Sequence, residues 1–388
     1  MKLENKIILL SADINPDEQK IQKLDNCLKE IRNWDFVTER LVSSGMGPLF
    51  YVKIPRLKNA DLIPARSVQR LKDAYYYTLS RSVMMYKVLN KVVTLLTGND
   101  IEVMVLKGAF LADALYGDVA LRMFSDIDLL VREQDADRAF GLLQQAGFQS
   151  DPGDSMLTFL RDKAKHEHLP QLVYKGIPVE LHTMLHKAED EYEFSPDEMW
   201  AHAQQVTLQG VEVKVPDWPD TLIHTSIHLN KHFRDGQIQM SGFNDIVNIL
   251  EVHRDTLDWV EVIKRSMQYK CENTVFKYIM LAHSTYRAYL PRYIVAEYVF
   301  YFSKEDTTLF RKYLTGFRGE HFSVESGLKR IQNMDSLRDK IKYVFWMMFP
   351  SKKYMIRSYN IKNPHLFWLY YPYRYWLGLK GIVRTIRK

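Results

Sequence analysis

Two aspartates separated by a single residue inside an apolar run are the first candidates for chemistry in this chain. Asp126 and Asp128 lie in residues 123–131, and side chains at positions i and i+2 of a strand point to the same side of a sheet. Carboxylates that share one face repel each other and shift each other's ionisation, unless a cation lies between them. The pattern therefore predicts a divalent metal site, Mg²⁺ or Mn²⁺.

A third carboxylate follows in a predicted hairpin, in which residues 168–174 and 177–182 flank Lys175-Gly176. In the second strand Glu180 and His182 share one face. Together with the two aspartates, Glu180 would complete a cage able to hold two Mg²⁺ ions with open positions for substrate phosphates. The alternative is that Asp126 and Asp128 cap or salt-bridge the end of a strand.

A strand, tight turn and helix are predicted just upstream. The β-branched run 101–106 stops at Lys107-Gly108, and helical character resumes over residues 110–116. A glycine there would let backbone N–H groups approach a phosphate at a helix N-terminus, and Lys107 could pair with that phosphate. The alternative is that Gly108 only allows the tight turn.

Helices must position these elements. We expect helices over about residues 16–31, 66–96 and 135–146, a loose loop near 151–154, and helices again beyond residue 187, with a small hairpin near 206–215. On a helix from Trp218 to about Lys231, His224, His228 and His232 recur every fourth residue. No acidic partner completes a zinc pattern, which favours packing and pocket-lining roles; Asp245 is placed to bond these histidines or a substrate.

Taken together, residues 105–108, 121–131 and 179–182 resemble the polymerase-β nucleotidyltransferase superfamily, and more closely its bacterial group of uncharacterised nucleotidyltransferases. The similarity covers about residues 101–185. It implies an α+β fold with a mixed sheet flanked by helices, in which Asp126, Asp128 and Glu180 match the metal ligands. At the turn the superfamily usually has Gly-Gly or Gly-Ser, whereas this chain has Gly108-Ala109.

The resemblance implies a two-metal transfer of a nucleoside monophosphate from a nucleoside triphosphate, ATP included, to a hydroxyl of a small molecule, glycan precursor or protein. Asp126, Asp128, Glu180 and His182 are the catalytic candidates, with His182 either a local base or a residue that orients Glu180. The candidates for phosphate contacts are Lys107, Gly108, Arg122 and Ser125, although Ser125 could equally cap a turn.

Composition and the lack of targeting features predict where such an enzyme would be found in the cell. Only two cysteines occur among 388 residues, no apolar run reaches about 18 residues, and the N-terminus lacks signal-peptide features, so we expect a cytoplasmic protein. We divide the chain into an N-terminal helical region (1–98), a nucleotidyltransferase core (99–186), a C-terminal helical domain (187–335) and a tail (336–388).

The tail is basic and aromatic. Residues 337–388 hold twelve Lys or Arg, one acidic residue and thirteen aromatics. That mixture is typical of peripheral contact with the inner face of a membrane, and of single-stranded nucleic-acid binding, which we do not expect here. The rings could also pack on the helical domain. An alternative function is a catalytically weak or inactive nucleotide-binding protein that docks at a membrane through this tail.

Overall fold

The computed structural model describes residues 3–150, 167–186, 190–234, 240–304, 306–308, 310, 337–349, 352, 355, 356, 359, 361 and 363–376. The loop expected near residues 151–154 lies outside this part of the chain. Among the described residues, no helix is long and apolar enough to cross a membrane.

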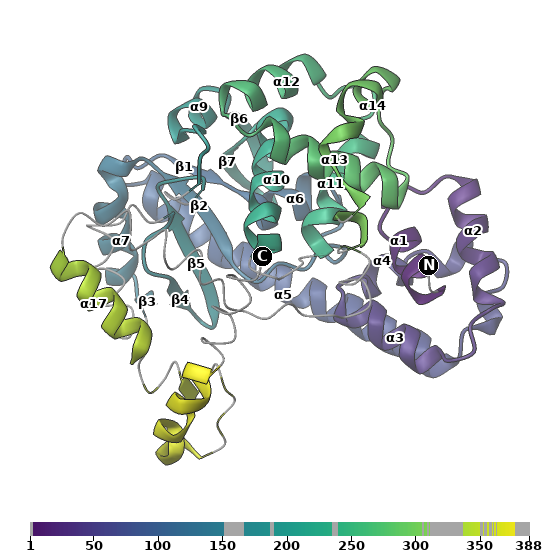
Figure 1. Ribbon diagram of the computed structural model, residues 1–388, viewed down its shortest axis with the longest axis horizontal. Helices are drawn as coiled ribbons and strands as arrows, with labels where there is room; N and C mark the ends of the chain where they lie inside the picture. The colour runs from purple at the N-terminus through teal and green to yellow at the C-terminus, as the bar shows by residue number, and fades with distance from the viewer. Residues whose placement is uncertain are drawn as a thin grey trace.

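A seven-stranded mixed sheet forms the centre of the molecule (Figure 1). Its spatial order is β3-β4-β5-β2-β1-β7-β6. The strands are β1 (Val103–Val105), β2 (Ile127–Val131), β3 (Gln149–Ser150), β4 (Leu172–Tyr174), β5 (Ile177–His182), β6 (Gln204–Leu208) and β7 (Val211–Val215). Central β2 runs parallel to β5 and antiparallel to β1, so the predicted mixed sheet and α+β class are confirmed.

Helices surround this sheet, and most bounds agree with the expected ones within a few residues. The α-helices referred to below are α1 (Leu3–Ser11), α2 (Glu18–Leu28), α3 (Trp34–Ser43), α4 (Gly47–Tyr51), α5 (Ala65–Thr97), α6 (Lys107–Ala114), α7 (Ala136–Gln145), α9 (Pro196–Ala201), α10 (Trp218–Arg234), α11 (Met240–Val252), α12 (Trp259–Gln268), α13 (Glu272–Tyr286), α14 (Arg292–Tyr298) and α17 (Leu337–Met348). A 3₁₀ segment, η6, spans Pro364–Leu369.

Local chemistry explains where several helices begin. Asp17 is the N-cap of α2 and accepts a hydrogen bond from the backbone of Lys20, so the helix starts two residues later than Pro16 suggested. Ser195 and Glu198 form a capping box at the start of α9. Pro64 precedes the long helix α5, which buries Leu71, Leu89 and Val92 along one side.

Burial is greatest where the two central strands cross the core. Every residue of β1 and β2 is buried, including Asp128, and α5 and α6 pack against these strands. A carboxylate inside such a strand needs a compensating charge or hydrogen bonds. The position of Asp128 therefore requires an explanation beyond packing.

The small hairpin expected near residues 206–215 is present as β6 and β7, and it joins the central sheet. Met104 of β1 pairs in parallel with Lys214 of β7. The sheet therefore includes strands on both sides of residue 186, where the sequence analysis placed a boundary. The division into four regions stays a prediction.

The N-terminal helices are joined to α11 by one buried amide. Asn248 donates to the carbonyl of Ala12 at 3.0 Å, and its Oδ1 accepts from the backbone N–H of Ile14 at 2.9 Å. Asn248 is fully buried. Because Asp245 of α11 lines the cavity described next, this amide connects the N-terminal region to the candidate site.

Candidate active site

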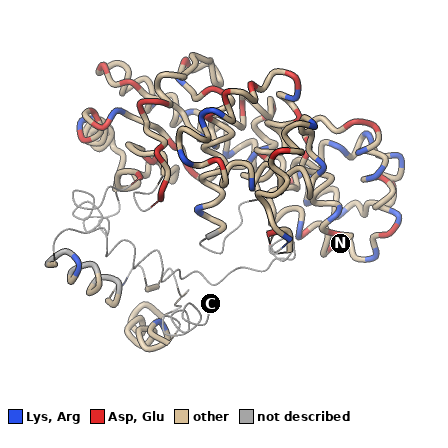
Figure 2. Tube along the Cα trace, turned by 45° about the horizontal axis from the view of Figure 1, so that its top comes forward, with Lys and Arg blue, Asp and Glu red and all other residues tan. Residues whose placement is uncertain are grey.

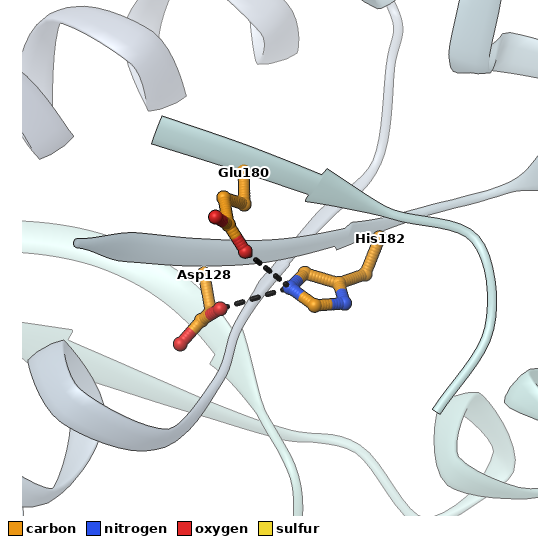
Figure 3. A group of neighbouring side chains, drawn as sticks. All are labelled: Asp128, Glu180 and His182. Atoms are coloured by element: carbon orange, nitrogen blue, oxygen red, sulfur yellow. Dashed lines mark hydrogen bonds and ion pairs between the residues drawn. The ribbon is translucent and has the colours of Figure 1, made fainter. Parts of the chain in front are cut away.

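The register of the two parallel strands brings a carboxylate of each strand to the same level. Asp128 of β2 pairs with Glu180 of β5, and Leu130 pairs with His182. Asp128, Glu180 and His182 each offer one ligand atom, and these atoms lie within 4.8 Å of one another (Figure 3). The structure thus brings Asp128 and Glu180 together, but the third member of this group is an imidazole nitrogen of His182 and not the expected carboxylate of Asp126.

Hydrogen bonds fix the members of this cluster. His182 Nε2 lies 2.8 Å from Asp128 Oδ1 and 3.8 Å from Glu180 Oε2, so the imidazole orients Asp128 rather than Glu180 (Figure 3). Gln171 of the hairpin donates to Glu180 Oε1 at 2.7 Å instead. Burial and the charge of Lys107 lower the pKa of His182, which keeps the ring neutral near pH 7.

Asp126 lies one residue before β2 and faces the same cavity. Burial, followed by the charges of Asp128 and Glu180, raises the pKa of Asp126 to about 6. Burial acts in the same direction on Asp128, but Lys107 and His182 outweigh it and hold the pKa of that carboxyl well below its usual range. Ser125 donates to Asp126 Oδ1 at 3.1 Å.

These carboxylates fit a divalent cation. Three acidic side chains line one cavity, and burial, followed by the charges of Asp128 and Glu180, raises the pKa of Asp126; a cation bound beside these carboxylates would offset that repulsion. Carboxylate oxygens are the donors that Mg²⁺ and Mn²⁺ prefer, and an imidazole is acceptable to Mn²⁺. Asp126, Asp128 and Glu180 would hold the metal, with His182 beside them.

The turn at the start of α6 differs from the expected one in which residue has the unusual backbone conformation. Lys107, not Gly108, has the left-handed backbone conformation, with a φ of 45°. A Cβ on Gly108 would lie 2.7 Å from Cβ of Phe124, closer than packing allows. Gly108 is therefore required because the helix start and the segment before β2 approach each other closely.

Lys107 and Ala109 occupy different environments at this turn. The Lys107 ammonium lies 3.5 Å from Asp128 Oδ1; burial would lower the pKa of Lys107, but the surrounding carboxylates outweigh it and raise the value. Ala109 is buried, and its carbonyl accepts a hydrogen bond from Tyr86 at 2.7 Å. The Lys107 side chain and the Gly108 backbone thus line the cavity, whereas the methyl group of Ala109 packs in the interior.

Arg122 and Asp245 form a buried pair that the sequence did not indicate. Arg122 donates through Nε and Nη2 to the two carboxylate oxygens of Asp245, at 2.8 and 2.6 Å. Tyr116 donates to Asp245 at 3.0 Å. Asp245 therefore bonds an arginine and a tyrosine rather than the histidines of α10. Arg122 lines the cavity, but two of its nitrogens are already engaged.

A cavity of about 780 Å³ connects these groups. His228 and His232 of α10 line this cavity, and their Nε2 atoms are 3.3 Å apart. His224 is buried and is not among the residues that line the cavity. Burial, helped by Lys107, lowers the pKa of His228 well below its ordinary value. Sequence reasoning did not single out several other lining residues: Tyr77, Arg81, Thr225, Lys231, Ser241 and Gly242.

Two further residues near Glu180 were also missed. Glu167, whose pKa is lowered to about 2 because Lys231 and Lys107 outweigh the effect of burial, pairs with Lys231 at 2.5 Å. His168 Nε2 lies 3.7 Å from Glu180 Oε2. The bridge between His168 and His182 brings both near the site. The only signal in the sequence was that His168 began a predicted hairpin, directly after Glu167.

The mixed sheet, the carboxylates on adjacent parallel strands and the Lys107-Gly108 turn at the start of a helix are the features that the resemblance to nucleotidyltransferases implied. Residues 30–287 match the sequence profile of the family described as uncharacterised nucleotidyltransferases. Because the match covers about two thirds of the chain, the chain belongs to this family, as the sequence resemblance indicated.

Comparisons with individual proteins add little. No functionally curated protein matches the chain. Among solved structures, an antigenic nucleotidyltransferase-like protein from Paracoccidioides brasiliensis is similar, with 14% identity and a TM-score of 0.22; the similarity covers 56% of this chain and 94% of that one.

Proposed function

We propose that this protein is a Mg²⁺-dependent nucleotidyltransferase, with Mn²⁺ as a substitute metal. It would transfer a nucleoside monophosphate from a nucleoside triphosphate, ATP among them, to a hydroxyl group of a small molecule, glycan precursor or protein. The observation that carries the proposal is the convergence of Asp126, Asp128 and Glu180 on one cavity.

The reaction is an in-line displacement at the α-phosphorus. A bond forms between the acceptor oxygen and the α-phosphorus, the bond to the bridging oxygen breaks, and pyrophosphate leaves with that electron pair. Bound divalent metal would supply charge stabilisation for the attacking and leaving oxygens. Asp126, Asp128 and Glu180 would fix its position, and Gln171 would hold the Glu180 carboxylate in place.

The remaining residues have proposed roles in binding and proton transfer. The Lys107 ammonium and the Gly108 amide would contact the triphosphate at the start of α6. Arg122 would contribute Nη1, since Nε and Nη2 bond Asp245. Ser125 would bond a phosphate oxygen or keep Asp126 oriented. Neutral His182 would accept the proton of the attacking hydroxyl, or act only by orienting Asp128.

Pyrophosphate release tests the proposal directly. Purified protein is incubated with Mg²⁺ and each of the four labelled ribonucleoside triphosphates, in the presence of a host lysate as the source of acceptor. We expect label on an acceptor and release of pyrophosphate, both abolished by Asp126→Asn. No release and no labelled product with any triphosphate would contradict the enzyme proposal.

A second candidate function is supported by α17, which both views place outside the main body (Figures 1 and 2). Leu337, Ile341, Val344, Phe345 and Met348 recur at helical spacing, and each is between 38% and 73% exposed. An exposed apolar stripe within a strongly basic segment is typical of helices that lie in a membrane interface. The protein would then be a nucleotide-binding module with little or no turnover, docked at anionic lipid.

Vesicle sedimentation separates the two candidates. Under the second, the protein sediments with phosphatidylglycerol vesicles but not with phosphatidylcholine vesicles, and Ile341→Glu with Phe345→Glu abolishes this binding. Phe36→Glu is the matched control, because Phe36 is similarly exposed on α3. Lipid binding with no pyrophosphate release would favour the docking module. Pyrophosphate release without lipid binding would leave nucleotidyl transfer alone.

A further inference from the structure

A second, smaller cavity of about 150 Å³ adjoins the catalytic one. The two cavities share Arg122, Met123 and Ser241 in their walls. Met123 lies three residues before Asp126, and Arg122 Nη1 lies 3.1 Å from the position of a Cβ on Gly108. A nucleotide whose phosphates lie between Gly108 and the carboxylates therefore has the small cavity beside it, on the α11 side.

The walls of the small cavity suit a flat heteroaromatic ring. Three methionine side chains from separate segments line it, together with two leucines: Met46, Met123, Met240, Leu49 and Leu121. Methionine is flexible and polarisable, and its sulfur makes favourable contacts with aromatic rings. The volume is also suitable, because an engineered apolar cavity of roughly 150 Å³ accommodates benzene.

One polar atom in this wall lacks a partner. Asn244 of α11 is 1% exposed, and its Nδ2 donates to the sulfur of Met46 at 3.4 Å. Its Oδ1 is buried without a hydrogen-bond partner among the residues that the structure describes. A buried amide oxygen without a donor is costly, so an amide of this kind in a residue that lines a cavity is what a ligand donor would satisfy.

We propose that the small cavity is the nucleobase subsite of the enzyme, and that Asn244 Oδ1 accepts a hydrogen bond from an exocyclic amino group of the base. The proposal rests on the proposed function, since the nucleotide must bind in the adjoining cavity. It assigns a substrate class: triphosphates whose base has an amino group on its pairing edge, as in adenine and cytosine, are preferred to oxo counterparts.

Two pairs of nucleotides isolate this contact. Hypoxanthine has an oxo group at the position of the amino group of adenine, and uracil has an oxo group at the position of the amino group of cytosine. The probes are the α,β-methylene triphosphates of adenosine, inosine, cytidine and uridine, bound in the presence of Mg²⁺ and measured by calorimetry. In at least one pair we expect the amino compound to bind about tenfold more tightly.

Asn244→Leu is expected to reduce that ratio to near one while binding of the oxo compounds changes less than about twofold. Asn90→Leu, the same change at an exposed position on α5, should retain the wild-type ratio. Should Asn244→Leu fail to fold, the wild-type ratios decide alone. Equal binding within both pairs, or discrimination that survives Asn244→Leu, overturns the subsite. Failure of all four probes to bind would instead contradict the proposed function, and the subsite with it.

Discussion

The β2–β5 strand pair and helix α11 both contribute carboxylates to the cavity, but the surroundings of these carboxylates differ. Asp126 has Asp128 and Glu180 as neighbours, and these charges, added to burial, raise its pKa to about 6. Asp245, equally close to the cavity, receives two hydrogen bonds from Arg122 and one from Tyr116. Carboxylates that repel one another, as around Asp126, are suited to binding a cation. A carboxylate that is fully hydrogen-bonded, as Asp245 is, instead connects two segments of the chain.

The largest expected effect tests the carboxylates that repel one another. Asp128→Asn removes a proposed metal ligand that is fixed by His182 and Lys107. We expect nucleotidyl transfer to fall by about 10³-fold, with the circular dichroism spectrum unchanged, because the charge on the reacting oxygens loses its stabilisation. The assay is pyrophosphate release.

Glu133→Gln is the matched control, since Glu133 is an exposed acidic residue just beyond the other end of β2. It should retain full activity. If Asp128→Asn retained more than about a tenth of the wild-type rate, the comparison between the two regions would fail.

The hydrogen-bonded carboxylate of Asp245 is tested by stability. Asp245→Ala leaves the buried guanidinium of Arg122 without its counter-charge, so we expect the free energy of unfolding to fall by about 3–5 kcal/mol. Urea denaturation measures the loss. The double variant Arg122→Met with Asp245→Leu should recover most of it, because no unpaired charge then remains buried.

Asp126→Asn should raise the free energy of unfolding of the metal-free protein, whereas Asp245→Ala should lower it. The pKa of Asp126 is about 6 in the folded state and near 3.8 when unfolded, so the ionised carboxylate destabilises the fold above that range. We expect the variant to be more stable than the wild type by about 3 kcal/mol at pH 7.5 in EDTA.

The pH dependence follows from the same shift. Well below pH 3.8 the carboxyl is protonated in both states and the difference disappears; it develops between about pH 3.8 and 6 and is constant above. Urea unfolding of both proteins at pH 4.0, 5.5 and 7.5 measures it. An Asp126→Asn variant less stable than the wild type in EDTA would show that the carboxylates are already balanced.

The smallest expected effect concerns the support of a ligand. Gln171→Ala removes the hydrogen bond that holds Glu180, without removing the carboxylate itself. We expect affinity for Mn²⁺, measured by calorimetry, to fall about tenfold. Gln149→Ala is the control, because Gln149 is an exposed glutamine in the neighbouring strand β3, away from the cavity. Unchanged Mn²⁺ affinity in Gln171→Ala would show that this hydrogen bond does not support metal binding by Glu180.

Much of the fold could be predicted because its signals are local. The β-branched run before Lys107, the apolar run around Asp128 and the Lys175-Gly176 turn each define an element through neighbouring residues. The family resemblance was confirmed on the same residues. Such short-range patterns set both element type and order.

The contacts between distant segments could not be predicted in this way. Arg122 and Asp245 are 123 positions apart, and nothing near either residue indicates the other. Lys214 pairs with Met104 for reasons of tertiary packing, which a two-residue period cannot reveal. The sequence shows a glycine at position 108, but not why a glycine is required there. The reason is the close approach of Phe124, which depends on the tertiary path of the chain between the two residues.

The bond between Arg122 and Asp245 also has a consequence for the order of folding during synthesis. The segment before β2 is fixed by a residue that leaves the ribosome more than a hundred residues later, and β7 must reach β1 over a similar separation. Contacts of such long sequence separation slow folding. We therefore expect the nascent chain to gain affinity for metal and nucleotide only after α11 has emerged and docked. Nucleotide binding by the chain would then show that the fold is complete.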